Sequence, residues 1–203
     1  ESGNALSVKV TDISVAAEEL TILDSKTTVA INLSSETLTG TEREILTAYA
    51  AHNAGTIIGL DNTFDAASYL ASHLDLIQAF GSNTTKAKIH FFQFGLSEER
   101  SLGSFDSKRY LASNPDLLFA FGSDTASAFN HYVNQGYREN RSLDNFDELG
   151  YIASYSDLIT AFGDDGSAGI DHFISFGYIE NREVTFDASS YLAANADLKT
   201  AFG

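Results

Sequence analysis

A repeat of about 41 residues constrains this chain more than any other feature of its sequence. Residues 64–81 read Phe-Asp-Ala-Ala-Ser-Tyr-Leu-Ala-Ser-His-Leu-Asp-Leu-Ile-Gln-Ala-Phe-Gly. Related segments stand at residues 105–122, 146–163 and 186–203. Repeats of this length form small units that bury their apolar faces by stacking on their neighbours.

A second block follows the first three copies. It starts with a histidine, passes through an aromatic residue and a glycine, and ends on an arginine. The histidines and arginines are His90, His131, His172, Arg100, Arg141 and Arg182. We divide the chain into a Thr-rich segment at 1–63, complete repeats at 64–104, 105–145 and 146–185, and a partial repeat at 186–203.

Cap signals predict three short helices in each complete repeat. An aspartate at the position of a helix N-cap follows each leading Phe: Asp65, Asp106, Asp147 and Asp187. A Ser-x-x-Asp pattern predicts a capping box for the second helix, beginning at Ser72, Ser113 and Ser154. Glycines at the ends of these segments indicate left-handed helix termini: Gly81, Gly122, Gly163 and Gly203. A third helix is expected to run through the histidine block.

The apolar positions of each repeat predict one buried face. Tyr69, Leu70 and Leu76, with their equivalents in the other copies, supply most of it. The equivalent tyrosines at 110, 151 and 191 could stack on sugars, but their helical spacing beside leucine favours core positions. The predicted fold class is mainly α, a superhelical array of short-helix repeats with a small N-terminal parallel β/α module.

The N-terminal segment differs from the repeats in its composition and in the spacing of its apolar residues. Val/Ile alternation predicts strands at 6–10, 28–33 and 56–60, and helices are expected at 15–23 and 41–50. Strands that alternate with helices indicate a parallel β/α arrangement. A module this small is expected to need packing on the first helical repeat or a continuation upstream.

The repeated histidines and arginines are the main site candidates. Because one copy occurs per repeat, they are expected to form a row and not to converge on a metal. We expect each histidine to bond a carboxylate or carbonyl of its own repeat. We expect each arginine to bind helix-end carbonyls or the capping aspartate of the next repeat, with an anion-binding row as the alternative.

Calcium is the one metal for which the sequence offers candidates. Asp124, Asp164 and Asp165 stand near glycines in loops, but helix capping explains Asp124 and Asp165 equally well. The spacing of an EF-hand loop is absent from the sequence. We therefore predict no required cofactor, with calcium as an open alternative.

Composition limits the classes of partner and reaction. The net charge of −16 argues against nucleic acid as a partner, and no apolar run is long enough to predict membrane insertion. The chain has no cysteine, which excludes disulfides and thiolate chemistry. It also has no serine-hydrolase, zinc-protease, phosphate-loop or dinucleotide motif, and its paired carboxylates recur in every repeat. The sequence therefore predicts a protein that is not an enzyme.

The helical repeat resembles tandem repeats of large secreted bacterial proteins, including RTX-type exoproteins, adhesins and surface-layer-like proteins. Residues 105–141 carry the pattern best, from Asn114-Pro-Asp-Leu to His131-Tyr and Glu139-x-Arg. Residues 7–60, with Leu-Thr-Gly-Thr at 38–41, look like Thr-rich repeats of giant secreted bacterial proteins. The glycine-rich nonapeptide that binds calcium in RTX proteins is absent from this sequence.

The resemblance implies an extracellular or bacterial cell-surface location. We expect a non-catalytic structural or adhesive module that acts by self-association or tethering. The expected partners are other copies of the chain or the rest of the same large chain, with a cell-surface glycan as an alternative. A glycan- or peptide-binding module and an accessory repeat array of a larger enzyme are the other functions considered.

The partial repeat provides a further expectation. It supplies two helices and lacks the third-helix block, so an apolar cluster is expected to stay exposed: Phe186, Tyr191, Leu192, Leu198 and Phe202. Either a longer chain or a second chain is expected to cover it.

Overall fold

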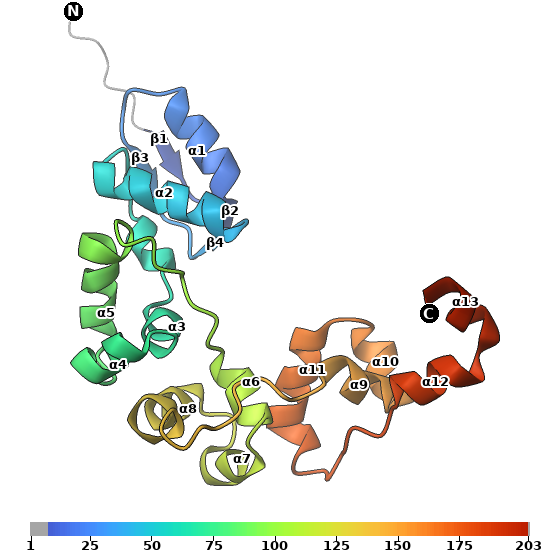
Figure 1. The fold of residues 1–203 in the computed structure, drawn as a ribbon. Coiled ribbons are helices and arrows are strands. Elements are labelled where there is room, and N and C mark those ends of the chain that lie inside the picture. Colours follow the sequence, from blue (N-terminus) through green and yellow to red (C-terminus); the bar gives the residue numbers. More distant parts are fainter. Residues whose placement is uncertain (1–7, 203) are drawn as a thin grey trace, which may run out of the picture. The chain divides into compact units, whose positions relative to one another are not determined.

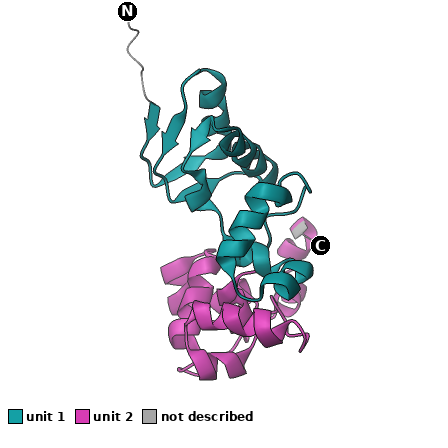
Figure 2. Cartoon of the chain, turned by 90° about the vertical axis from the view of Figure 1, so that its left-hand side faces the viewer, with its two compact units in different colours: residues 1–104 teal, residues 105–203 magenta. Residues whose placement is uncertain are grey.

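The computed structural model describes residues 8–202 and is mainly helical, with a small module of parallel strands in its N-terminal part (Figure 1). This confirms the predicted mainly α class with a small N-terminal parallel β/α module. Contacts divide the chain into two compact units, residues 1–104 and 105–203 (Figure 2). The sequence boundary at 63/64 therefore falls inside the first compact unit.

The N-terminal module contains two small parallel sheets. One consists of β1 (Val8–Val10), β3 (Ile31–Leu33) and β5 (Ile57–Ile58), in the order β1-β3-β5. The other consists of β2 (Ser14–Ala16) and β4 (Thr37–Thr39). The helices α1 (Ala17–Ser25) and α2 (Glu42–Ala54) pack against each other. The parallel pairing agrees with prediction, but β2 and β4 were not predicted. Most of β2 had been assigned to the helix at 15–23, and β4 has a single apolar residue, Leu38, between two threonines.

The strand register reveals successive coils of similar length. Val8 pairs with Ile31 and Ser14 pairs with Thr37, so the first coil advances both sheets by 23 residues. Ile31 then pairs with Ile57, an advance of 26 residues. Each coil contributes one strand to each sheet and then a helix. The predicted strand at 6–10 begins among residues that lie outside the described part of the chain.

An aromatic cluster packs this module on the first repeat. The Tyr49 ring of α2 meets the edges or faces of Phe64, Phe91 and Phe92 at centroid distances of 5.5–5.9 Å. Tyr49 is 2% exposed, and its hydroxyl lies 3.0 Å from Thr63 Oγ1. The expected dependence of the small module on the first repeat thus has a physical basis, since the two share one core.

Each complete repeat folds into three short helices and a π-helical turn. The first repeat contains α3 (Ala66–Ala71), α4 (Leu74–Phe80), α5 (Thr84–His90) and the π-turn η2 (Phe91–Gly95). The second contains α6 (Ser107–Ala112), α7 (Pro115–Phe121), α8 (Thr125–His131) and η3 (Tyr132–Gly136). The third contains α9 (Glu148–Ala153), α10 (Ser156–Phe162), α11 (Gly166–His172) and η4 (Phe173–Gly177). The partial repeat contains α12 (Ala188–Ala194) and α13 (Ala196–Phe202).

The predicted aspartate caps are present. The carboxylates of Asp65, Asp106, Asp147 and Asp187 each accept hydrogen bonds from backbone N–H groups in the first turn of the helix that follows. Asn83, Asp124 and Asp165 do the same for the third helices. These bonds satisfy donors that a helix leaves free at its start.

The predicted capping boxes of the second helices are wrong. Their N-cap residues are His73, Asn114 and Tyr155, and none makes a side-chain cap bond. The serine one position earlier instead accepts from the segment that ends the repeat. Ser113 Oγ, for example, accepts from the Asn145 N–H at 2.9 Å. Serine can bond any nearby N–H, so the local pattern did not identify its partner.

The glycines that end the second helices have positive φ, but they do not adopt the predicted left-handed helical conformation. Gly122 has φ 59° and ψ −134°, and the Asp124 N–H bonds the Phe121 carbonyl at 3.2 Å. Glycine at this position is typical of a type II′ turn. Gly81 and Gly163 have the same geometry, and Gly203 lies outside the described residues.

In the second compact unit, neighbouring repeats stack through their first and third helices. Helix α11 and turn η4 of the third repeat contact α6 of the second repeat. The Lys108 ammonium lies 2.6 Å from the Asp171 carboxylate at this contact. The superhelical arrangement of the whole array stays a prediction.

Within residues 8–202, none of the helices combines the length and apolar character that a membrane span requires.

The π-turn glycine is predicted to be essential for packing. A Cβ on Gly136 would overlap the Tyr110 hydroxyl, and one on Gly95 would lie 2.6 Å from the Tyr69 hydroxyl. Gly136→Ala should therefore lower the free energy of unfolding by about 1–3 kcal/mol, as measured by urea denaturation.

Tyr110→Phe serves as the matched test of this clash. Tyr110→Phe removes the oxygen that the new Cβ would overlap. The double variant Gly136→Ala/Tyr110→Phe should therefore lose less free energy of unfolding than the sum of the losses in the two single variants. Strict additivity would contradict the proposed contact.

Candidate functional site: a repeated polar cluster

A buried tyrosine lies at the centre of every complete repeat. Tyr69, Tyr110 and Tyr151 are 0% exposed and come from the first helix of their repeats. Each hydroxyl bonds Nδ1 of the histidine that ends the third helix, at 3.1, 2.9 and 2.9 Å respectively. Burial raises the pKa of each phenol to about 12, because the phenolate would lose its hydration.

The histidines therefore bond inside their own repeats, but their partner differs from the one predicted. The expected partner was a carboxylate or carbonyl, and the structure places a phenol there. In the first repeat, His90 Nε2 also lies 4.0 Å from Glu98 Oε2. A buried hydroxyl needs a hydrogen-bond partner, and this requirement accounts for the pairing.

Aromatic rings enclose the phenol and the imidazole. The leading Phe stacks on the aromatic residue after the histidine: Phe64 on Phe91, Phe105 on Tyr132 and Phe146 on Phe173, at 4.3–4.7 Å between centroids. The Phe that ends the second helix meets the imidazole at 5.7–5.9 Å. The same ring arrangement thus recurs in three repeats.

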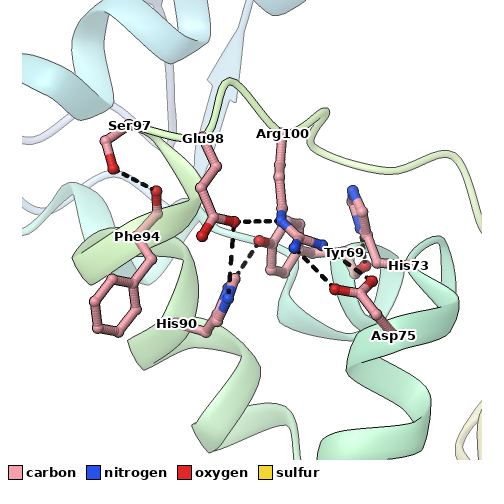
Figure 3. Close-up of polar contacts among 8 residues, drawn as sticks. All are labelled: Tyr69, His73, Asp75, His90, Phe94, Ser97, Glu98 and Arg100. Atoms are coloured by element: carbon pink, nitrogen blue, oxygen red, sulfur yellow. Dashed lines mark hydrogen bonds and ion pairs between the residues drawn. The ribbon is translucent and has the colours of Figure 1, made fainter.

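Each repeated arginine binds two carboxylates of its own repeat. Arg100 donates from Nε to Glu98 at 2.6 Å, and its two terminal nitrogens lie 3.0 and 2.8 Å from the Asp75 oxygens (Figure 3). Arg141 donates from Nε to Glu139 and from Nη1 to both Asp116 oxygens, and Arg182 donates from Nε to Glu180 and from Nη1 to Asp157. The planar guanidinium suits this paired recognition.

This result corrects the prediction for the arginines. They bind neither helix-end carbonyls nor the capping aspartate of the next repeat; each holds the second helix against the end of the third-helix block. The sequence carried the signal, because an aspartate and a glutamate recur at fixed distances from each arginine. The aspartates had been assigned to capping boxes instead.

A left-handed residue positions each arginine. Glu99, Asn140 and Asn181 precede the arginines and have φ values of 54°, 55° and 56°. This conformation is uncommon for residues other than glycine. It turns the chain back after the π-turn, so that the arginine reaches the second helix 25 residues earlier in the sequence.

The ion pairs shift the acidity of the aspartates. Hydrogen bonds from the arginines lower the pKa of Asp75, Asp116 and Asp157 below its ordinary value. The paired guanidiniums have raised pKa values for the same reason. Each arginine binds one carboxylate through Nε and a second one through a terminal nitrogen.

The calcium candidates lie in helix-capping loops. Asp124 and Asp165 accept from backbone N–H groups as N-caps, and Asp164 is exposed beside Asp165. Among residues 8–202, no three acidic, histidine or cysteine side chains gather closely enough to hold a metal ion.

A recess of about 260 Å³ lies in the first compact unit, between α2 and the start of the first repeat. Tyr49, Thr63 and Asp65 are among its lining residues. Tyr49 and Thr63 bond each other, and Asp65 caps α3, so these polar groups already have structural partners.

The partial repeat keeps the local geometry of a complete one. The Asn195 amide donates to the Tyr191 carbonyl at 2.7 Å, as Asn114 donates to the Tyr110 carbonyl at 2.7 Å. Tyr191, however, is 52% exposed. The complete repeats thus bury this tyrosine, as predicted, and the partial repeat exposes it, as expected for its apolar cluster.

Comparison of the chain with protein-family models, with curated proteins and with solved structures found no match.

We expect Arg141 to stabilise the second repeat. Arg141→Ala would release Asp116 and Glu139, and should lower the free energy of unfolding by about 1 kcal/mol, since the pairs are partly exposed. Arg138→Ala is the matched control, because Arg138 has no carboxylate partner within residues 8–202 and contacts the neighbouring Tyr137. Equal losses of unfolding free energy in Arg141→Ala and Arg138→Ala, measured by urea denaturation, would show that the Arg141 ion pairs do not stabilise the repeat.

The lowered aspartate pKa values predict acid sensitivity. Folding favours the ionised form of these carboxylates, so their contribution is present above the ordinary aspartate pKa of about 4 and is lost as pH falls below it. The free energy of unfolding should drop between about pH 5 and pH 2. Asp116→Asn should have a lower free energy of unfolding than wild type at pH 7 and should lose less of it on acidification. Asp164→Asn should have the free energy of unfolding of wild type at neutral and at acid pH. Identical acid losses in Asp116→Asn and wild type would count against this linkage.

Proposed function

We propose that this chain is a non-catalytic, extracellular repeat module of a bacterial surface protein that acts by self-association or tethering. The observation that carries the proposal is the polar cluster itself. It occurs three times with the same partners, and its strongest hydrogen-bonding groups are bonded to one another. A catalytic group needs free capacity to bind a reacting atom, and a catalytic centre is expected once per chain.

The surface supports an interaction role. In the second compact unit several large apolar side chains are exposed, led by Phe119 at 86%, Ile179 at 76% and Phe176 at 59%. Single exposed apolar residues are ordinary on protein surfaces, but aromatic rings are common anchors in binding interfaces. The resemblance to repeats of secreted bacterial proteins supports the proposed setting.

A glycan- or peptide-binding module is the second candidate. The exposed Phe119 ring favours it, because an aromatic face can stack on a sugar ring or on a peptide side chain. This reading predicts a monomer that binds ligand. The role of an accessory array in a larger enzyme has no comparable support from side chains of this chain.

Sedimentation velocity over a range of concentrations tests the proposal. Self-association predicts oligomers that grow with concentration without added ligand. Because the helices carry their own caps and apolar faces, the same behaviour and the same helicity are expected in excess chelator. Phe119→Ser should reduce association, with the exposed Thr160→Ser at the equivalent position of the third repeat as control.

A monomer at high concentration would contradict self-association. If that monomer binds a glycan and Phe119→Ser abolishes binding, the second candidate replaces the first. Loss of helicity in chelator would show instead that the acidic loops hold a structural cation.

A further inference from the structure

The two helices of the partial repeat leave an apolar face open. Tyr191 is 52% exposed, whereas Tyr69, Tyr110 and Tyr151 are 0% exposed at the same position. Leu192 and Leu198 are only half-buried, whereas their equivalents Ile152 and Leu158 in the third repeat are 2% and 3% exposed. The complete repeats identify what covers this face, since α5, α8 and α11 contact the first helix of their own repeats.

The open face also has two polar groups without their usual partners. Asp197 stands where Asp157 binds Arg182 at 2.8 Å, and Tyr191 stands where the Tyr151 hydroxyl bonds His172 at 2.9 Å. Among residues 8–202, neither the Asp197 carboxylate nor the Tyr191 hydroxyl has a partner. An acceptor for an arginine and a hydrogen-bonding hydroxyl for a histidine thus lie beside the apolar side chains.

The partial repeat is already organised to receive a helix. Asp187 caps α12, and the Asn195 amide holds the junction between α12 and α13. The Ser154 hydroxyl of the third repeat accepts from the Thr185 and Phe186 N–H groups at 2.8 and 2.9 Å. A binding surface that is ordered beforehand costs less conformational entropy on binding.

We infer that the face formed by α12 and α13 binds one helical segment with the chemistry of this repeat's own third helix. That segment carries a histidine, an aromatic residue after it, a glycine five positions after the histidine, and a Glu-x-Arg ending. The histidine would bond the Tyr191 hydroxyl, the aromatic ring would stack on Phe186, and the arginine would bind Asp197. The glycine is required because in the third repeat a Cβ on Gly177 would overlap the Tyr151 hydroxyl.

The third repeat sets a preference for one further residue of the incoming helix. Helix α11 covers its own repeat and also reaches α6, where Asp171 pairs with Lys108. The residue equivalent to Lys108 in the third repeat is Leu149, which is 53% exposed. An incoming helix should therefore favour an apolar residue where α11 has Asp171. Ile89 occupies that position in α5.

This inference rests on the proposed function, because a surface that accepts a repeat-type helix is a means of tethering. The probe is a fluorescent synthetic peptide with the sequence of residues 82–102, which contains Ile89, His90, Gly95 and Arg100. Fluorescence anisotropy with the 203-residue chain should show saturable binding with one peptide per chain. A scrambled peptide should not bind.

Matched variants test each contact. Asp197→Asn in the protein should weaken binding roughly tenfold, the effect of losing a charge-assisted hydrogen bond. Asp164→Asn, which removes an exposed carboxylate elsewhere, should leave it unchanged. Arg100→Ala and Gly95→Ala in the peptide should each weaken binding at least as much, and Ile89→Asp should weaken it unless the protein carries Leu149→Lys.

The inference is overturned if the peptide does not bind at concentrations up to about 1 mM, where even weak specific interfaces are occupied. It is also overturned if Asp197→Asn and Arg100→Ala leave the affinity unchanged, which would indicate unspecific apolar adsorption. Assembly through paired partial repeats of two copies, without peptide binding, would overturn it and leave the proposed function standing. Peptide binding by a chain that stays monomeric would support the acceptor face and contradict self-association.

Discussion

The complete repeats depend on one contact, a buried tyrosine ring packed against the glycine of a π-helical turn. The rings of Tyr69, Tyr110 and Tyr151 are fully buried, and the glycine leaves room for each hydroxyl. The π-turn carries the chain past this oxygen with bonds from i+5 to i, such as Tyr137 N–H to the Tyr132 carbonyl at 3.1 Å. Because the phenol is buried, it needs a partner, and the histidine at the start of the turn provides it.

The arginine holds the second helix of each repeat against the helices that the tyrosine joins. The three helices of a repeat are too short to be stable alone, so tertiary contacts must hold them. Tyrosine, histidine and the leading Phe join the first helix to the third. Arginine then joins the end of the third-helix block to the second helix through an aspartate. The contacts among the three helices thus lie within each repeat. The residues at the contact between neighbouring repeats can therefore differ from one repeat to the next.

The sequence predicted the units of this fold better than the contacts inside them. Local signals with a single physical meaning were read correctly: the aspartate N-caps and the apolar tyrosine positions in the complete repeats. Signals with several meanings were not. Asp116 in a Ser-x-x-Asp pattern fits a capping box as well as an ion pair, and only the fold brings Arg141 to it from 25 residues away. Two strands were missed: the helix predicted at 15–23 covered most of β2, and β4 has only one apolar residue, Leu38, between two threonines.

Charge sets the conditions under which such a module could associate. Lys and Arg number 12 against 28 Asp and Glu, and every repeat arginine is already bound to two carboxylates. Each cluster therefore keeps a net negative charge, and copies of the chain repel one another over about a Debye length, ~8 Å at physiological ionic strength. Apolar contact is not screened by salt, whereas this repulsion is. Association through exposed apolar side chains should consequently strengthen as salt rises, the opposite of an assembly held by ion pairs between copies, and this sign separates the two kinds of interface.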